Sequence, residues 1–200
     1  MPSPAATKYG IAAERVRILL ATGNDRRLRP MTSAQVQAYL HASLAANVAA
    51  WEAYVQNLVQ DFFIEIANPL LLDFHAVHGI ARSAAEIALE RYNTPNWDNT
   101  RNLLARYTGY DPIRDWVWPV RRMGVHQVKE RLDQILEVRH SFAHGFPLPA
   151  FPWTQSTSGR LRLTSQAVRT TTAFFGNLVS RTDKSMKAYI GAAYGKRVPW

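Results

Sequence analysis

An unbroken apolar stripe constrains the fold of this chain more than any other feature. It begins behind Thr32, which forms a capping box with Gln35, and it ends at Asn68 and Pro69. Apolar residues recur at helical spacing along it: Val36, Leu40, Leu44, Val48, Trp51, Val55, Leu58, Phe62 and Ile66. A helix of about 35 residues is roughly 50 Å long. Because the stripe is too broad for a coiled-coil seam, we predict the spine of a helical bundle.

Shorter helical patterns surround this spine. Similar periodicity predicts a last helix capped by Ser165 and further helices over about 9–22, 70–92, 97–107 and 125–144. The predicted inward residues are Ile11, Val16, Leu19 and Leu20 in the first helix, and Leu72, His75, Ile80, Ala84, Ile87 and Leu89 in 70–92. No segment alternates apolar and polar side chains, so no central sheet is expected. The predicted fold class is all-α, an up-and-down helical bundle of five to six helices.

Composition and charge narrow the class of protein. The 200 residues carry a formal charge of +9, and 47% of them are hydrophobic, which suits one domain with a core. A polyanion is the default partner of so basic a chain, although many basic proteins bind no nucleic acid. The absence of cysteine excludes disulfides, thiolate metal sites and cysteine nucleophiles. With no apolar run of 18 residues and no leader-like N-terminus, we expect a cytoplasmic protein without a membrane partner.

The histidines outside the C-terminal half do not indicate a metal site. His75 and His78 are three residues apart and have the spacing of a chelating pair. No acidic or cysteine ligands cluster near them, so hydrogen-bonded or surface histidines are the favoured interpretation. We therefore expect neither a metal nor a cofactor.

The strongest chemical groups lie where the helix over 125–144 ends. The residues there read VRHSFAHG, and Gly145 offers a left-handed cap. His140 and His144, four residues apart, share one face of the helix. Arg139 and His144 differ by roughly 140° around the axis, so they border one pocket only if the last turn is irregular or a partner surface completes the site.

Two other features bear on this motif. A second Arg-x4-His pair, Arg121 and His126, straddles Gly124 in a predicted turn, and we interpret it as a chance match. Glu52 lies near the middle of the long helix. A carboxylate there ordinarily faces solvent, and the alternative is that it reaches across to Arg139.

The pattern as a whole resembles the HEPN superfamily. The segment RHSFAH, from Arg139 to His144, matches the Rx4-6H motif of that superfamily. Other segments are similar to its RiboL-PSP branch, namely WEAY at 51–54, YNTPN at 92–96, Gly109, Trp116 and LEVR at 136–139. The resemblance covers about 36–145 well and the last helix loosely. We predict an N-terminal extension with a short helix over 1–30, a HEPN-like helical domain over 31–195 and a basic tail over 196–200.

This resemblance implies a metal-independent endoribonuclease that needs no cofactor. By the same resemblance Arg139 and His144 are the catalytic residues. His140 supports them at the polar second position of the motif, where many members carry asparagine. Glu52 and Asn93 lie in the other matching segments and are carried over as supporting residues.

The residue types suit RNA cleavage without a metal. Such cleavage needs a base for the 2′-OH, an acid for the 5′-oxygen and a cation for the phosphorane. An imidazole serves as acid or base, and a guanidinium fits two phosphoryl oxygens. One motif per chain supplies few groups for the roles of acid, base and cation together. A two-fold dimer through the motif face doubles this set of groups, and family members form dimers in this manner. The expected partners are RNA, a second copy and an antitoxin or defence protein, in a toxin–antitoxin, antiviral-defence or RNA-processing role.

Two other interpretations stay open. A HEPN module without catalysis would bind RNA or a nucleotide, or dock a partner protein, and would be equally basic and helical. A purely structural role would pair Arg139 with Glu52 and leave His144 to cap the C-terminus of its helix. The intact Arg139 and His144 favour the catalytic interpretation.

Overall fold

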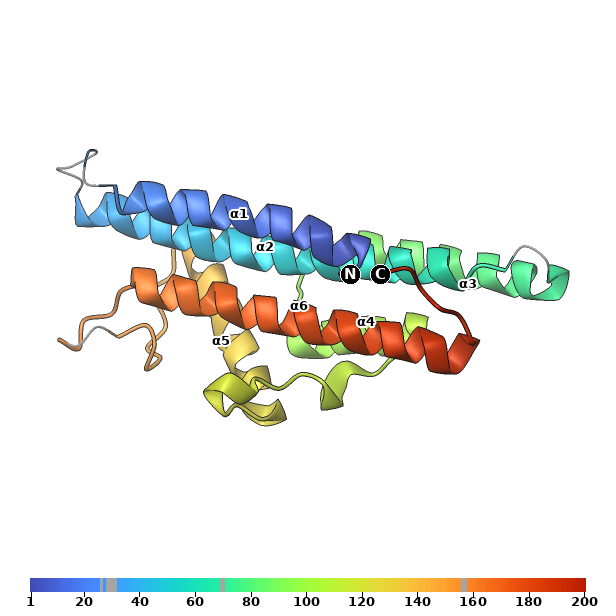
Figure 1. The fold of residues 1–200 in the computed structure, drawn as a ribbon. Coiled ribbons are helices and arrows are strands. Elements are labelled where there is room, and N and C mark those ends of the chain that lie inside the picture. The colour runs from blue at the N-terminus through green and yellow to red at the C-terminus, as the bar shows by residue number, and fades with distance from the viewer. Residues whose placement is uncertain (26, 28–31, 69–70, 156–157) are drawn as a thin grey trace.

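The long helix lies at the centre of the structure. The computed structural model describes residues 1–25, 27, 32–68, 71–155 and 158–200, which contain six α-helices: α1 (Pro4–Gly23), α2 (Ser33–Ile66), α3 (Leu72–Glu90), α4 (Trp97–Thr108), α5 (Val125–Ala143) and α6 (Ser165–Tyr194). Two short 3-10 helices, η2 (Pro112–Arg114) and η3 (Pro119–Arg121), join α4 to α5. Figure 1 shows α1 and α6 running alongside α2, while α5 crosses behind α6 at a steep angle. The described residues form only isolated bridges and no strand, so the all-α prediction is confirmed.

The start of α2 and its buried face follow the predicted pattern. The Thr32 side chain accepts a hydrogen bond from the Gln35 backbone N–H, and the Gln35 side chain accepts one from the Thr32 backbone. The apolar stripe is buried from Leu40 to Ile66. Each large apolar side chain buried in this way contributes about 1.5–3 kcal/mol, so the stripe is a principal source of stability.

The first helix begins at Pro4 rather than near residue 9. Ser3 caps it and is fully buried, and both its backbone N–H (3.0 Å) and its hydroxyl donate to the carboxylate of Asp183 on α6. The Ala5 backbone N–H donates to Asp61 on α2 at 2.8 Å. Two carboxylates therefore satisfy N–H groups that a helix start leaves without partners, and this fixes the early start.

The predicted inward face of α3 is wrong. Four of the predicted inward residues are exposed, namely His75, Ile80 (by 74%), Ala84 and Ile87, whereas Leu89 is buried as predicted. The Leu72 side chain lies outside the described residues. Figure 1 shows α3 extending beyond the other helices, so few neighbours cover it and periodicity alone could not select its buried face. That face is formed by Ala85 and Leu89, with Phe74, His78 and Ala88 partly buried.

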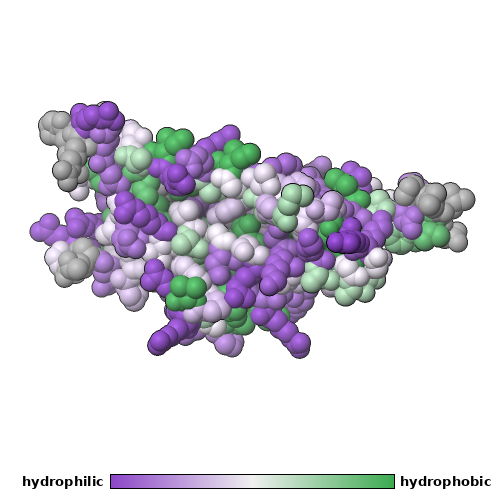
Figure 2. All heavy atoms as spheres, in the orientation of Figure 1, coloured by the Kyte–Doolittle hydropathy of each residue, from purple (hydrophilic) through white to green (hydrophobic). Residues whose placement is uncertain are grey.

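Apolar residues also reach the surface of α1. Val16 and Leu20 are buried as predicted, but Ile11 is 62% exposed. Figure 2 shows hydrophobic groups over α1 that are separated by hydrophilic side chains. Single exposed apolar residues of this kind are normal on soluble surfaces. Among the residues described, no helix combines the length and the apolar character that a membrane crossing requires.

Packing in the C-terminal half holds the site-bearing helix in place. The inner face of α5 buries four apolar side chains, Val128, Leu132, Ile135 and Val138, together with Ser141. Trp116 lies against Trp51 and Trp97 and donates from its indole N–H to Thr182 of α6 at 2.9 Å. The N-cap of α6 is Thr164 rather than the predicted Ser165. An aromatic cluster thus connects α2, α4 and α6 beneath the motif.

Candidate functional site

The motif lies at the C-terminus of α5, as the sequence predicts. His144 is the C-cap residue, and its backbone N–H donates to the carbonyl of His140 at 3.1 Å. Gly145 follows with φ +69°, and the Phe146 N–H donates to the Ser141 carbonyl at 2.8 Å. These bonds form a Schellman motif, in which glycine takes the left-handed position without a steric penalty. The helix therefore stops with the side chains of its last turn exposed.

Two imidazoles and a phenyl ring form an exposed group at this helix end. The ring centroids of His140 and His144 are 4.2 Å apart, which confirms that the two residues share a face. The Phe146 ring lies 5.9 Å from His144 and nearly parallel to it. All three residues are exposed. Both imidazoles can therefore reach a ligand that approaches from solvent.

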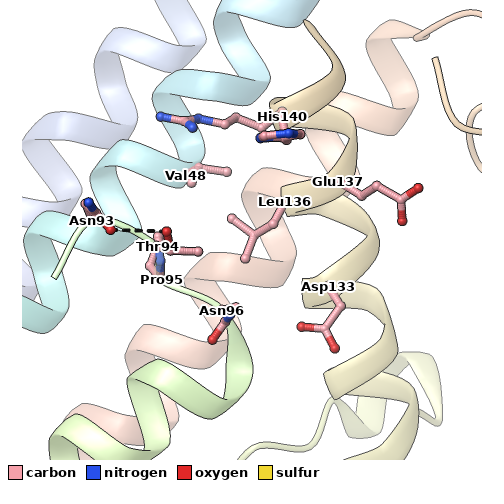
Figure 3. Close-up of a pocket in the computed structure, with 10 residues that line it drawn as sticks. Val48, Asn93, Thr94, Pro95, Asn96, Asp133, Leu136, Glu137 and His140 are labelled. Atoms are coloured by element: carbon pink, nitrogen blue, oxygen red, sulfur yellow. Dashed lines mark hydrogen bonds between the residues drawn. The ribbon is translucent and has the colours of Figure 1, made fainter. Parts of the chain in front are cut away.

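A pocket of about 340 Å³ lies beside the motif, between α5, α2 and the segment that precedes α4. Its lining residues are Val48, Asn93, Thr94, Pro95, Asn96, Asp133, Leu136, Glu137, Arg139 and His140 (Figure 3). The structure thus brings Arg139, His140 and Asn93 together. His144 is not among the lining residues, in agreement with its angular separation from Arg139 on the helix.

Hydrogen bonds fix the segment 93–96 against α2 and α4. The indole N–H of Trp51 donates to the Pro95 carbonyl at 3.2 Å, and the Gln56 amide donates to the Tyr92 carbonyl at 3.2 Å. The Asn99 amide donates to the Thr94 carbonyl at 3.0 Å. The WEAY and YNTPN segments are therefore in direct contact, and one wall of the pocket is anchored to the core.

The two asparagines of this wall are partly engaged. Asn96 is the N-cap of α4, and its side-chain oxygen accepts from the Asn99 backbone N–H at 2.7 Å. The Asn93 side-chain oxygen accepts from the Thr94 hydroxyl at 3.2 Å. In each case the amide oxygen is occupied, and the NH₂ group is the part that can donate to a ligand.

Glu52 lies near Arg139 but forms no ion pair with it in the described part of the chain. Burial raises the pKa of the half-buried Glu52 carboxyl, and the positive charge of Arg139 partly opposes this shift. The guanidinium is exposed on the surface beside the pocket. Arg139 is consequently available to an anionic ligand, and Glu52 is a nearby negative charge that does not pair with it.

His41 is a neighbour of the motif that the sequence analysis missed. Its ring stacks on Phe142 with a centroid distance of 4.5 Å and an interplanar angle of 7°. Burial lowers the pKa of His41, and its Nδ1 is buried without a hydrogen-bond partner among the described residues. Residue spacing could have identified His41, because Val48 follows it by seven residues and Glu52 follows Val48 by four, which places all three on one face of α2.

The histidines that we set aside lie away from the motif. His126 is exposed in the first turn of α5, and Arg121 lies on η3 with its guanidinium 5.7 Å from the Trp118 ring centroid. His78 hydrogen-bonds the Phe63 carbonyl at 2.8 Å, while His75 is exposed. Within the described residues no three metal-ligating side chains form a group.

A comparison with known protein families gives a match that spans most of the chain. The family model described as RiboL-PSP-HEPN matches residues 12–188. The chain belongs to the RiboL-PSP-HEPN family. The match includes every residue that lines the pocket and the whole of the motif. Membership of this HEPN family indicates a nuclease or RNA-binding function. No curated protein and no solved structure matches the chain. The divisions predicted near residues 30 and 195 stay predictions.

Proposed function

We propose that this RiboL-PSP-HEPN protein is an endoribonuclease that cleaves RNA through attack by a 2′-OH and without a metal ion. The observation that carries the proposal is one helix end that exposes the guanidinium of Arg139 together with the imidazoles of His140 and His144. A structural role would require Glu52 to neutralise Arg139 in an ion pair, and the two side chains make none. A phosphate can take that place, since a guanidinium binds two of its oxygens at once.

The proposed reaction needs one proton acceptor, one proton donor and one cation. An imidazole removes the proton of the 2′-OH while the 2′-oxygen attacks phosphorus. The bond to the 5′-oxygen then breaks as a protonated imidazole transfers a proton to that oxygen. Arg139 stabilises the charge of the phosphorane between these steps. The products are a 2′,3′-cyclic phosphate and a free 5′-OH. We assign proton transfer to His144 and a supporting role to His140.

A second copy of the chain is part of the proposal. The pocket of one chain includes Arg139 and His140 but not His144. A two-fold axis near the motif would bring the His144 of one protomer toward the Arg139 of the other and supply two imidazoles. The biological settings that such an enzyme fits are a toxin–antitoxin pair, antiviral defence and RNA processing, with an antitoxin or defence protein as regulator.

The test is cleavage of single-stranded RNA in EDTA by the wild type and matched variants. His144→Ala should lower the rate by roughly 10²–10⁴-fold, the usual contribution of general acid–base catalysis. Arg139→Ala should cost a similar factor, and Arg139→Lys should recover little because an ammonium lacks the bidentate fork. His126→Ala is the control, since it removes an exposed histidine at the other end of α5, and it should leave the rate unchanged. A 2′-deoxy substitution at the cleaved nucleotide should block the reaction.

Binding without cleavage is the alternative function. Its distinctive result would be a wild type that binds RNA in an Arg139-dependent manner and yields no cyclic phosphate. Cleavage by His144→Ala at the wild-type rate would assign the activity to another site and would reject the proposed mechanism.

A further inference from the structure

The pocket beside the motif differs in chemistry between its two ends. His140 and Arg139 belong to the end near the motif, whereas Asp133 and Asn96 form the opposite end. Figure 3 shows His140 and Asp133 on the same side of α5, with Asn96 on the opposite wall of the pocket from Asp133. Seven residues of helix span about 10 Å, which is comparable to the reach of one nucleotide from its phosphate to the far edge of its base.

Apolar side chains line much of the middle of the pocket, alongside Thr94. Leu136 projects from α5 into the space between the two ends, and Val48 and Pro95 lie on the facing side (Figure 3). Val48 and Pro95 are buried, and Pro95 is held by the indole of Trp51 at 3.2 Å. Two apolar walls of this kind suit a flat ring. A phosphate is disfavoured at the end of the pocket that Asp133 and Asn96 form, because the Asp133 carboxylate repels it.

The polar groups of Asp133 and Asn96, at the end of the pocket away from the motif, are complementary. Burial raises the pKa of the Asp133 carboxyl, and the nearby backbone N–H of Trp97 partly opposes this shift. The carboxylate oxygens can accept hydrogen bonds from a ligand. The side-chain oxygen of Asn96 is occupied by Asn99 at 2.7 Å, so Asn96 offers its NH₂ group. An acceptor and a donor thus line the same end of the pocket.

We propose that this end of the pocket is a nucleobase subsite that selects guanine, with Asp133 as the specificity-determining residue. The inference rests on the proposed function, because it places the phosphate of the same nucleotide at Arg139. Guanine presents two neighbouring donors, N1–H and the N2 amino group, which one carboxylate can accept together. Its O6 lies beside N1–H, where the Asn96 amide can donate. Single-stranded RNA is commonly read along this edge of its bases.

The other three bases match the subsite less well. Uracil presents one donor between two carbonyl oxygens, so one of these oxygens would face the carboxylate. Adenine and cytosine each present an amino group next to a ring nitrogen acceptor, and the carboxylate would pair with the first while repelling the second. A bidentate pair to a base edge discriminates by about 1–3 kcal/mol. That range corresponds to roughly 5- to 150-fold in affinity.

The experiment measures binding and cleavage separately. Hexamers of uridine that carry 2′-fluorine at every position, and so cannot be cleaved, are compared with strands that hold one guanine, adenine or cytosine. The wild type should bind the guanine strand at least about fivefold more tightly than the others. Asp133→Asn keeps the shape of the side chain but replaces one acceptor oxygen with an NH₂ group, and its preference should fall to within about twofold. Glu130→Gln removes an exposed carboxylate one turn earlier on α5 and should keep the preference of the wild type.

A second variant distinguishes loss of base recognition from a structural effect of Asp133→Asn. Asn96→Asp preserves the N-cap of α4 and removes the donor to O6, so it should also lower the guanine preference while its melting temperature stays near that of the wild type. A guanine preference without any cleavage would reject the ribonuclease and retain the subsite. Cleavage without base preference, equal preference in Asp133→Asn and the wild type, or no binding of any strand would overturn the subsite.

Discussion

The hydrogen bond between Trp51 and Pro95 joins the aromatic core to the pocket, and its loss should be measurable as stability. We consider Trp51→Phe together with Trp116→Phe. Both indoles are fully buried, and both donate one hydrogen bond, to the Pro95 carbonyl at 3.2 Å and to the Thr182 hydroxyl at 2.9 Å. The two substitutions remove the same atoms from the same cluster, so their packing losses largely cancel in the comparison.

The two hydrogen-bond acceptors, the Thr182 hydroxyl and the Pro95 carbonyl, differ in the hydrogen bonds that remain to them after the substitutions. The Thr182 hydroxyl still donates to the Leu178 carbonyl at 2.8 Å after Trp116→Phe, so the cost is that of a single net hydrogen bond, about 0.5–1.5 kcal/mol. Pro95 is buried, and its carbonyl loses its indole donor in Trp51→Phe, which costs about 1–3 kcal/mol. Trp51→Phe should therefore be the less stable variant by about 1 kcal/mol. In a chain of this size that difference lowers the melting temperature by about 2–4 °C.

Urea unfolding followed by circular dichroism gives both free energies of unfolding. RNA affinity supplies an independent readout, because Trp51→Phe removes one of the hydrogen bonds that hold the wall formed by Asn93–Asn96, whereas Trp116→Phe removes none of them. Weaker RNA binding is expected for Trp51→Phe alone. Equal unfolding free energies and equal affinities in the two variants would refute the role assigned to this bond.

Two further predictions concern the fold and the assembly. Burial raises the pKa of Asp61, so the folded chain binds its proton more readily than the unfolded chain, and stability is lost as pH rises from about 3.8 through the raised value. Asp61→Asn keeps an acceptor for the Ala5 N–H, and thermal scans should show it melting above the wild type at pH 7, with a smaller difference near pH 4. The active species should be a dimer through the motif face. Light scattering at micromolar concentration measures the oligomeric state. A strictly monomeric protein that still cleaves RNA would contradict this arrangement.

The parts of the fold that follow from neighbouring residues could be predicted from the sequence. The capping box at Thr32 and the stripe of α2 depend on spacing within one helix, and the end of α5 depends on Gly145. The face of α3 could not be predicted, because burial there depends on which helices cover it. Ile80 has the same local pattern as a core residue and lies in solvent.

In the candidate site, too, the features that depend on neighbouring residues could be predicted and those that depend on contacts between distant segments could not. Arg139, His140 and His144 follow from a short motif at a helix end. The pocket arises where α5 meets the segment 93–96, and the bond from Trp51 to Pro95 joins positions far apart in the chain. Helical periodicity carries no information about such contacts. For the same reason Asp133 and His41 gained significance only from the elements packed against them.

The segment that follows α5 gives the protein an optical reporter of its own. Trp153 is half-buried, whereas the other five tryptophans are buried. Its indole N–H donates to Gln134 at 2.8 Å, and the guanidinium of Arg131 lies 3.9 Å from its ring centroid. A collisional quencher such as iodide therefore reaches this fluorophore before the others. Detachment of the segment from α5 would change the emission of Trp153 while the bundle stays folded, which separates motion near the motif from global unfolding.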